Sequence, residues 1–572
     1  MAIATGKYIG FVDGDDWVDR NMFKGLSDAL EKNNDSEIAM CGVETIFKYD
    51  EEKSIRKGYD NYFNINKVGE FPIDKNTFCI NKPCWNKLYR RSFLCSNGII
   101  FPEGMNNEDE VFHNFVLSRA THITFVKGNW YKYMRYGTGI IADQNKSFAE
   151  TQTLPDYFTK VWPLLIEYIK RDLKYDILPD MTDVLLSKIN EFKGENTDLL
   201  VSTLLHRLDY PTVAECIDPD PNSDKRRMLQ MLYDLNGHKE IEEPNPALLP
   251  KPLTPVEGVE HPMFSFVVPV YNSSKFLHKS MKSLREQSFK NIEIICVNDG
   301  SIDSSEQILN DYARIDKRIQ VISQENKGAF VARKTGVTKA KGKYLLCIDP
   351  DDWIDPNTCS IIDSMLKTND VDIIQYAVNL EYDLSLFDKG YIKGLQIFFD
   401  RSNDVTEGNS EALIRSCFLT EDFLWHYWGK AIRMSVAKEA FAQMPDIKCN
   451  FAEDQVAMFY ILSYARNLIN TEQRLYHYRL GSGISTKEKE ALENFDIKLE
   501  CFELFHQLTL FAKEHYPQNS EIVKKSLDFI FNSMMDNMWR RLIENAKQDD
   551  ISEWILHWCE KAGTDKVVGY LI

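Results

Sequence analysis

The sequence predicts an α/β fold in which a largely parallel sheet occurs once in full and once in part. Strands alternate with helices between residues 264 and 349, each of these strands is an apolar run that ends in polar residues, and a segment near the start of the chain recurs near residue 349. Alternation of this kind is typical of a parallel sheet whose strands are joined by crossover helices.

The complete copy carries the series of elements that predicts its sheet. Continuous apolar runs such as "FSFVVPVYN" predict buried strands, and apolar residues at three-to-four spacing predict helices. The expected elements are strands at 264–272, 292–301, 319–324 and 343–349, separated by a helix at 273–287, a helix with a serine cap at 304–316 and a loop entering a helix at 325–340.

An internal repeat relates the two copies. The segment "GKYIGFVDGDDWVD" at 6–19 returns as "GKYLLCIDPDDWID" at 342–355. Three further pairs of blocks follow in the same order: "CWNKLYRRSFL" and "YWGKAIRMSVA", "NNEDEVFHNFVL" and "NFAEDQVAMFYIL", and "WYKYMRYGTGI" and "LYHYRLGSGI". Four similar blocks in one order indicate a duplicated domain.

The first copy is incomplete. Only twelve residues precede Asp13, so the strand–helix series of the second copy is missing. A half-domain of this kind should expose strand edges, which other chains can pair with. Three explanations stay open: a truncated reading frame with its missing half encoded upstream, a half-domain that packs on another copy of the protein, and an inactive scaffold. We favour truncation and assign this copy no independent catalysis.

The repeat divides the chain into five expected parts. Residues 1–145 form the partial copy, and residues 263–486 form the complete one. Helical spacing predicts a helical appendage after each copy, at 146–240 and at 487–572. A proline-rich stretch at 241–262 predicts an extended linker between them.

Composition and charge exclude several classes of protein. At 572 residues the chain is too long for one core, so three or four domains are expected. The net charge of -18 argues against a nucleic-acid partner, which needs a basic surface. The 12 cysteines are scattered and form no CxxC pair, which favours a reducing, cytosolic compartment over a zinc site or a disulfide framework. No apolar run is long enough for a membrane span, and the N-terminus has no signal-peptide pattern.

Polar residues follow the strands of the complete copy. Ligands of parallel sheets bind beyond the carboxyl ends of the strands, so Asn272, Asp299, Arg333 and Asp349 are expected at one rim. In "DPDD", Asp349 and Asp351 offer hard oxygen ligands that suit Mg²⁺ or Mn²⁺. An isolated acidic run is more often a charged turn, but the buried strand before it and the tryptophan after it, both seen twice, favour a metal site. Alone, "VNDGS" is explained equally well as a turn.

The ordered set "VVPVYN", "VNDGS", "ENKGAFVARKTG", "YLLCIDPDDW", "FAEDQ" and "YHYR" resembles the family 2 glycosyltransferases of the GT-A fold. These are mostly inverting, nucleotide-sugar-dependent enzymes that build bacterial capsules, lipopolysaccharide and related glycans. Residues 264–485 carry the full set, and residues 4–140 carry its second half. The resemblance implies a GT-A domain with a Rossmann-like mixed sheet, preceded by a partial GT-A half-domain and accompanied by α-helical appendages.

The resemblance also implies a donor site. Tyr271, after Pro269, would lie against the nucleotide base. Asp299 would hydrogen-bond the base, with Arg333 nearby. Asp349 would contact the ribose or the metal.

A metal site and a diphosphate contact are implied next to it. Asp351 would ligate the Mg²⁺ or Mn²⁺ ion that bridges the donor diphosphate, where it assists departure of the nucleoside diphosphate. Arg479 would meet the diphosphate, and His477 would be a further metal ligand. A histidine that only packs at this place explains His477 equally well.

The block "FAEDQ" supplies the other half of the reaction. By resemblance, Asp454 would be the general base that deprotonates the acceptor hydroxyl, with Glu453 as the alternative base. Asp352, Trp428, Lys430 and Glu453 would shape the acceptor pocket. For an acidic pair before a helix, capping is the simpler explanation, and core packing explains the tryptophan equally well.

The sequence thus predicts a hexosyl- or N-acetylhexosaminyltransferase that takes its sugar from a nucleotide-diphosphate donor, by resemblance a UDP-sugar. The acceptor would be a glycan or a lipid-linked glycan, which places the chain in the cytoplasm or peripherally on the inner membrane. A non-catalytic scaffold that binds sugars or nucleotides is the alternative, because fold does not guarantee function. A nucleotidyltransferase is disfavoured, since "PVYNSSKFLHKS" stands where a glycine-rich basic loop is expected.

Overall fold

A computed structural model of the chain contains two compact units, Met1–Thr254 and Pro255–Ile572, which we describe separately. The structure describes residues 4–48, 54–58, 68–73, 83–102, 105, 108–136, 161–172, 249, 251, 253–382, 389–401, 404–405, 408–449, 451–481, 498–516, 518, 520–545 and 551–571.

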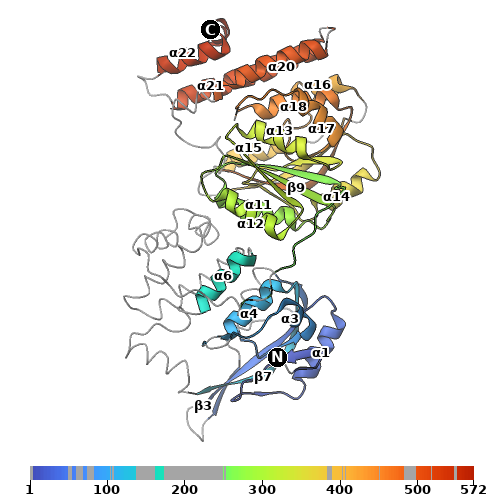
Figure 1. Cartoon of the computed structure of the whole chain (residues 1–572), viewed down its shortest axis with the longest axis vertical. Helices are drawn as coiled ribbons and strands as arrows, with labels where there is room; N and C mark the ends of the chain where they lie inside the picture. The colour runs from blue at the N-terminus through green and yellow to red at the C-terminus, as the bar shows by residue number, and fades with distance from the viewer. Residues whose placement is uncertain are drawn as a thin grey trace. The chain divides into compact units, whose positions relative to one another are not determined.

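The second unit is built on a mixed eight-stranded sheet (Figure 1). Its strands lie in the order β10-β9-β8-β11-β14-β13-β15-β12. The first four are parallel, β14 is antiparallel to both of its neighbours, β13 and β15 are parallel, and β12 is antiparallel to β15. Their bounds are β8 Phe264–Val270, β9 Ile292–Asp299, β10 Ile319–Gln324, β11 Tyr344–Cys347, β12 Trp353–Ile354, β13 Ile373–Glu381, β14 Lys430–Arg433 and β15 Leu468–Arg479.

Helices cover both faces of this sheet. In Figure 1, α11 and α12 lie on one face, and α13, α17 and α18 lie on the other. The helix bounds are α11 Ser274–Arg285, α12 Ser305–Ile315, α13 Ala329–Lys339, α14 Thr358–Leu366, α15 Lys389–Phe399, α16 Ser410–Phe418, α17 Met434–Gln443 and α18 Glu453–Tyr464. The predicted α/β fold class is therefore confirmed.

The C-terminal helices continue the core of the second unit. They are α20 Cys501–His515, α21 Glu521–Asn545, α22 Ile551–Ala562 and α23 Thr564–Leu571. Trp558 is fully buried in the same hydrophobic cluster as Val267 of the central strand and Met458 of α18. The predicted helical character of 487–572 thus holds for its described part, and these helices share one core with the sheet.

The strand–helix series expected between residues 264 and 349 is present in full. One detail differs, because the serine expected to cap α12 makes no side-chain capping bond. Instead Asp303 Oδ1 accepts a hydrogen bond from the Ser305 N–H at 3.0 Å, and its Oδ2 accepts one from the Ser274 N–H at 3.0 Å. A single carboxylate therefore caps the first turns of both α11 and α12.

The first unit contains a seven-stranded sheet with β1 Tyr8–Gly10, β2 Trp17–Val18, β3 Ile38–Lys48, β4 Ser54–Gly58, β5 Gly69–Pro72, β6 Lys87–Arg90 and β7 His122–Tyr136. Its helices include α1 Met22–Lys32, α3 Arg91–Asn97, α4 Glu108–Arg119 and α6 Trp162–Asp172. The path β1-β6-β3-β7-β2 repeats the order and the directions of β11-β14-β13-β15-β12. β3 and β13 even share a register shift after Cys41 and after Tyr376.

The two sheets differ at one edge. Among the described residues of the first unit, β1 pairs only with β6, whereas its counterpart β11 also pairs with β8. Gly342 shows what this neighbour requires, because a Cβ there would lie 2.5 Å from Ser265 Oγ and 2.7 Å from the Ser265 nitrogen. A Cβ on Gly6, its counterpart in the repeat, would meet only the Tyr8 carbonyl, at 3.3 Å.

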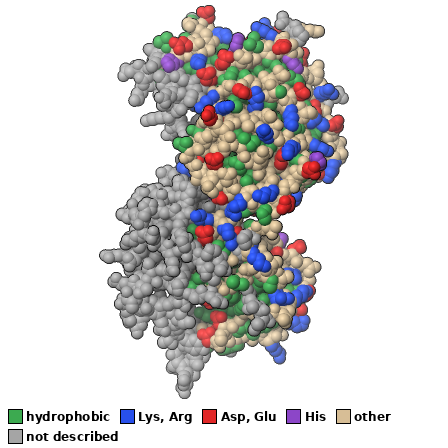
Figure 2. Space-filling view, viewed as in Figure 1, with side chains coloured by type: hydrophobic (Ala, Val, Ile, Leu, Met, Phe, Trp, Pro, Cys, Tyr) green, Lys and Arg blue, Asp and Glu red, His purple; other side chains and the backbone are tan. Residues whose placement is uncertain are grey.

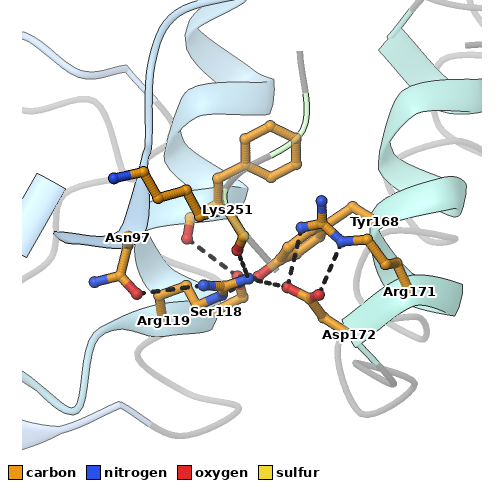
Figure 3. Close-up of polar contacts among 8 residues, drawn as sticks. Asn97, Ser118, Arg119, Tyr168, Arg171, Asp172 and Lys251 are labelled. Atoms are coloured by element: carbon orange, nitrogen blue, oxygen red, sulfur yellow. Dashed lines mark hydrogen bonds and ion pairs between the residues drawn. The ribbon is translucent and has the colours of Figure 1, made fainter. Parts of the chain in front are cut away.

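A buried polar cluster attaches α6 to the rest of the first unit (Figure 3). The Arg119 guanidinium forms an ion pair with Asp172, and these side chains are 4% and 2% exposed. Arg119 also donates to the Lys251 carbonyl at 3.0 Å and to Asn97 Oδ1 at 3.3 Å. Of the predicted appendage at 146–240, only α6 lies within the described residues, and the linker at 241–262 is described mainly from residue 253.

Two surface properties bear on the sequence predictions. Within the described residues, no helix combines the length and the apolar character that crossing a bilayer requires. On the face of the second unit that Figure 2 shows, Lys and Arg side chains are interspersed with Asp and Glu, and the described residues form no continuous basic stripe there.

Candidate active site

The acidic turn after β11 is held by one tyrosine. Tyr476 of β15 donates its hydroxyl hydrogen to Asp352 Oδ2 at 2.7 Å and accepts a hydrogen bond from the Asp349 N–H at 3.3 Å. Asp352 Oδ1 accepts a further bond from the Arg479 N–H at 2.8 Å. Burial, reinforced by the Asp351 and Asp349 charges, raises the pKa of Asp352 well above its usual value. Asp352 is only 1% exposed, and its two hydrogen bonds hold the turn against β15.

A buried arginine joins this turn to α18. Arg333 of α13 forms an ion pair with Asp349, and its Nη1 lies 3.7 Å from Glu453 Oε1. Its guanidinium also lies 4.6 Å from the ring centroid of Tyr427. The sequence analysis expects Arg333 near Asp299, and the structure pairs its guanidinium with the acidic turn and the head of α18. One cation thus balances two carboxylates from distant parts of the chain.

Asp299, at the end of β9, organises the loop that follows β10. Its carboxylate accepts hydrogen bonds from Gln324 Nε2 at 2.7 Å, the Lys327 N–H at 2.9 Å and the Gly328 N–H at 2.8 Å. Gly328 has a φ of 85°, which favours glycine at this turn into α13. Asp299 therefore fixes the loop that precedes α13.

Two residues at the end of β8 border the same rim. Pro269 is buried within the strand, whereas the Tyr271 side chain is 44% exposed. Asn272 follows with a φ of 48°, and its Oδ1 accepts a hydrogen bond from the Ile302 N–H at 2.8 Å. An exposed aromatic ring beside a rigid turn offers a flat surface on which a base can stack.

The head of α18 presents two adjacent carboxylates. Ala452, directly before the helix, has a φ of 55°, an uncommon backbone conformation for a residue other than glycine. Burial and the neighbouring Glu453 carboxylate raise the pKa of Asp454 to about 7. Burial also raises the pKa of Glu453, although Arg333 opposes this. A carboxyl group with a pKa near 7 is suited to accept a proton at neutral pH.

Trp428 and Lys430 lie beneath this site. The Trp428 ring stacks on Tyr476 and Tyr478, with ring centroids 5.0 and 5.1 Å apart. Lys430 is fully buried and donates to the His426 carbonyl at 2.6 Å. Burial lowers the pKa of Lys430 to about 7. Both side chains are therefore held rigidly in the core next to the acidic turn and the His426 loop.

The predicted metal ligands come from adjacent strands. β12, which follows Asp351, pairs with β15, where His477 lies opposite Trp353 and stacks on its ring at 5.2 Å. His477 Nδ1 lies 2.8 Å from Glu381 Oε1, which leaves Nε2 as the nitrogen for a metal. No group of three or more His, Cys, Asp or Glu side chains that could hold an ion occurs in the described part of the chain. A carboxylate oxygen and an imidazole nitrogen are donor types that Mg²⁺ or Mn²⁺ accepts, and such ions usually take their other ligands from phosphate and water.

Arg479, at the end of β15, contacts the acidic turn. Its Nε donates to the Asp351 carbonyl at 3.1 Å, and its guanidinium lies 4.9 Å from the Phe276 ring centroid and 5.3 Å from that of Trp353. Packing between two rings holds the positive charge next to Asp351. It is thus positioned to meet an anionic group bound at that turn.

The first unit reproduces much of this framework. Tyr131 donates to Asp16 Oδ2 at 2.7 Å and accepts from the Asp13 N–H at 3.1 Å, and Trp85 stacks on Tyr131 at 4.2 Å. Burial raises the pKa of Asp109, the counterpart of Asp454, to about 6. These are the contacts of Tyr476, Asp352, Asp349 and Trp428.

Three side chains distinguish the first unit from the second. Met134 donates its backbone N–H to Asp16 as Arg479 does to Asp352, but it has no charge. Lys132 occupies the position of His477 and forms an ion pair with Glu44. Pro83 occupies the position of His426. The half that carries Tyr271, Asp299 and Arg333 has no counterpart among the described residues of the first unit.

Sequence reasoning missed Tyr476, Glu381 and His426. The tyrosine could have been found, because it recurs in both copies within "WYKY" and "LYHY". Glu381 lies 96 residues from its partner His477, and no motif connects them. His426 lies 3.5 Å from Asp454, measured from Nε2 to Oδ2, but has no equivalent in the repeat.

Comparisons with known proteins find similar glycosyltransferases. The model of the family "Glycosyl transferase family 2" matches residues 265–427. EpsH of Bacillus subtilis is 30% identical over 296 residues, which cover 50% of this chain and 82% of EpsH. Glycosyltransferase GlyG of Streptococcus pneumoniae is 30% identical, over 39% of this chain and 74% of its own length. Minor teichoic acid biosynthesis protein GgaB of Bacillus subtilis is 26% identical, over 51% of this chain and 30% of GgaB.

Solved structures are similar at lower identity. The crystal structure of S. aureus TarS 1-349 in complex with UDP is 18% identical to this chain, with a TM-score of 0.38. The match covers 54% of this chain and 82% of that one.

Proposed function

The chain belongs to glycosyl transferase family 2, and from this premise we propose that its second unit transfers a sugar from a nucleotide-diphosphate donor to a glycan hydroxyl with inversion. The observation that carries the proposal is the position of Asp454. It is a partly buried carboxyl group, 24% exposed, with a pKa near 7 at the head of α18, and Arg333 links this helix end to the acidic turn.

In this proposal the donor binds across the ends of β8, β9 and β11. Tyr271 stacks on the base, and Asp299 hydrogen-bonds the base or orders the loop around it. Asp349 contacts the ribose or the metal, and Arg479 contacts the diphosphate. UDP is the proposed carrier on the family resemblance alone, and the transferred group is a hexosyl or N-acetylhexosaminyl group.

Deprotonation of the acceptor hydroxyl is assigned to Asp454 of α18. Asp454 accepts the proton of the acceptor hydroxyl as the oxygen attacks the anomeric carbon from the face opposite the leaving group. Positioning contributes most of the rate enhancement, because the acceptor oxygen and the donor carbon must meet in line. Glu453, next to Arg333, sustains the raised pKa of Asp454 and is the alternative base.

A divalent cation fits the acidic turn. Asp351 and His477 Nε2 would hold Mg²⁺ or Mn²⁺, which supplies Lewis-acid stabilisation of the departing diphosphate when bound. The chain's own contribution is to orient these two ligands through Arg479, Tyr476 and Glu381.

The acceptor is proposed to be a bacterial surface polysaccharide or a lipid-linked precursor. The name of the relative GgaB, a teichoic acid biosynthesis protein, supports this class. The reaction would take place in the cytoplasm or at the cytoplasmic face of the membrane, where nucleotide sugars and growing lipid-linked glycans meet.

A thermal-shift screen tests this function. We expect one nucleotide sugar, with UDP-sugars first in the screen, to raise the melting temperature of the second unit in the presence of Mn²⁺. The shift should be lost in Asp351→Ala, because the diphosphate then lacks its bridge. If no nucleotide sugar shifts the melting temperature, donor binding is refuted. If a nucleotide sugar binds but the wild type releases no more nucleoside diphosphate than Asp351→Ala, the non-catalytic scaffold is the correct alternative.

A further inference from the structure

We propose that His426 is a positioning residue for the general base, donating its Nε2–H to Asp454 and holding the ionised carboxylate toward the acceptor. This inference rests on the proposed function of Asp454. His426 lies in the loop between α16 and β14, and nothing in the sequence pattern singles it out.

The geometry of the loop aims the imidazole at α18. His426 Nε2 lies 3.5 Å from Asp454 Oδ2, and the Gln455 N–H donates to Asp454 Oδ1 at 2.9 Å. The histidine contact is long for a hydrogen bond, as catalytic hydrogen bonds often are before the substrate binds. A carboxylate oxygen can accept two hydrogen bonds. Each oxygen of Asp454 has one of the two contacts just described, so each can still accept a bond from the acceptor hydroxyl.

Aromatic packing determines the orientation of the ring. The His426 ring lies 4.5 Å from Trp428, 5.7 Å from Phe399 and 5.8 Å from Trp425, measured between centroids. The backbone carbonyl of His426 accepts the Lys430 Nζ bond, which holds the loop from below. The imidazole therefore has little freedom to turn away from Asp454.

The ring is neutral in this position. Burial, together with the positive charge of Lys430, lowers the pKa of His426 to about 3. Nδ1 is buried and has no hydrogen-bond partner in the described part of the chain. The Nε2–H tautomer alone gives Asp454 a donor, and the proton taken from the acceptor goes to Asp454 while His426 keeps its own.

The other titratable groups around Asp454 are Glu453, Arg333, Lys430, Tyr427, Tyr478, Cys417 and Cys449.

The first unit supplies a natural comparison. Pro83 occupies the place of His426, and its carbonyl accepts the Lys87 Nζ bond at 2.5 Å as the His426 carbonyl accepts that of Lys430 at 2.6 Å. The loop backbone is thus kept in both units, and the imidazole occurs only in the unit with the complete sheet. This distribution is expected of a residue that serves the reaction, because the loop forms without it.

The test compares two replacements at one position. H426F keeps a ring against Trp428 but has no N–H, whereas H426Q restores an amide donor. For H426F we expect kcat to fall about ten- to hundredfold, the range for losing a hydrogen bond to a charged group. The donor KM should stay unchanged. The acid limb of the kcat profile should move to higher pH, because the ionised form of Asp454 loses a donor. H426Q should recover most of the rate and the wild-type limb.

Controls separate this inference from the function it rests on. H278Q changes another buried histidine, on α11 against Tyr312, and should leave the pH profile unchanged. Equal losses in H426F and H426Q, or an acid limb that does not move, would overturn the role of His426. Full turnover by D454N would overturn the proposed base itself, whatever the histidine variants do. If H426F melts early, H426M against H426Q makes the same comparison.

Discussion

Arg333→Met should destabilise the second unit strongly and in a pH-dependent way. The Arg333 side chain is 6% exposed, and its partners Asp349 and Glu453 are 23% and 16% exposed. Removing one partner of a buried ion pair costs about 3 to 5 kcal/mol, and the partial exposure of Asp349 favours the lower value. For a unit of this size, about 3 kcal/mol corresponds to a melting temperature lower by roughly 6 °C.

The pH dependence of this effect has a definite sign. Arg333 lowers the pKa of both Glu453 and Asp454, which burial holds above their usual values. Without the arginine these pKa values rise further, so the folded variant binds protons at a pH where the wild type does not. At pH 5 Asp454 is protonated in both proteins, so its part of the deficit is lost, whereas at pH 8, above its wild-type pKa of about 7, that part is present.

Calorimetry of the full chain can follow the second unit's transition at both pH values. Lys334→Met is the matched control one residue along α13, because its partner Asp446 is 69% exposed and such a pair contributes about 1 kcal/mol or less. A deficit for Arg333→Met that equals the control, or that does not change between pH 5 and pH 8, would refute the idea that this cation balances the site.

Three further predictions follow from contacts in the two units. Arg119→Met removes one of the two arginines paired with the buried Asp172, with Arg171 remaining at 3.0 Å, so it should lower the free energy of unfolding of the first unit by about 1.5 to 3 kcal/mol and leave that of the second unchanged; Lys24→Met, from an exposed pair, should change neither. Asp299→Asn should speed amide hydrogen exchange at Lys327 and Gly328 and raise the donor KM by about tenfold, while unchanged exchange would contradict its role in ordering the loop. Tyr476→Phe and Tyr131→Phe should each destabilise their own unit by about 1 to 3 kcal/mol, because Asp352 and Asp16 lose the same donor; unequal effects in calorimetry would show that the two turns are not equivalent.

Local sequence patterns predicted the part of the candidate site that lies within residues 264–349. The strand–helix series from 264 to 349 and the acidic turn were found because apolar runs and turn residues act over a few neighbours. The repeat also indicated that Asp13 and Asp349 belong to equivalent turns, and the two sheets share their order and register.

Contacts between residues far apart in the chain could not be predicted from local sequence patterns. The charge of Arg333 is balanced by Asp349 and by Glu453 of α18, which no local pattern links to it. The serine cap of α12 was wrong because Asp303 can serve two helix ends at once, which depends on how α11 packs beside α12. His426 could not be found, since its role depends on a distance to Asp454 across the pocket.

The most direct test of the account compares one aspartate in each unit. With the nucleotide sugar that gives the largest thermal shift, and with an acceptor, release of nucleoside diphosphate is measured for the wild type, Asp454→Asn and Asp109→Asn. The account predicts that Asp454→Asn slows turnover by about 10² to 10⁴, while Asp109→Asn, at the equivalent place of the first unit, leaves it unchanged. Turnover that survives Asp454→Asn, or that falls as far in Asp109→Asn, would contradict the claim that the chemistry belongs to the second unit.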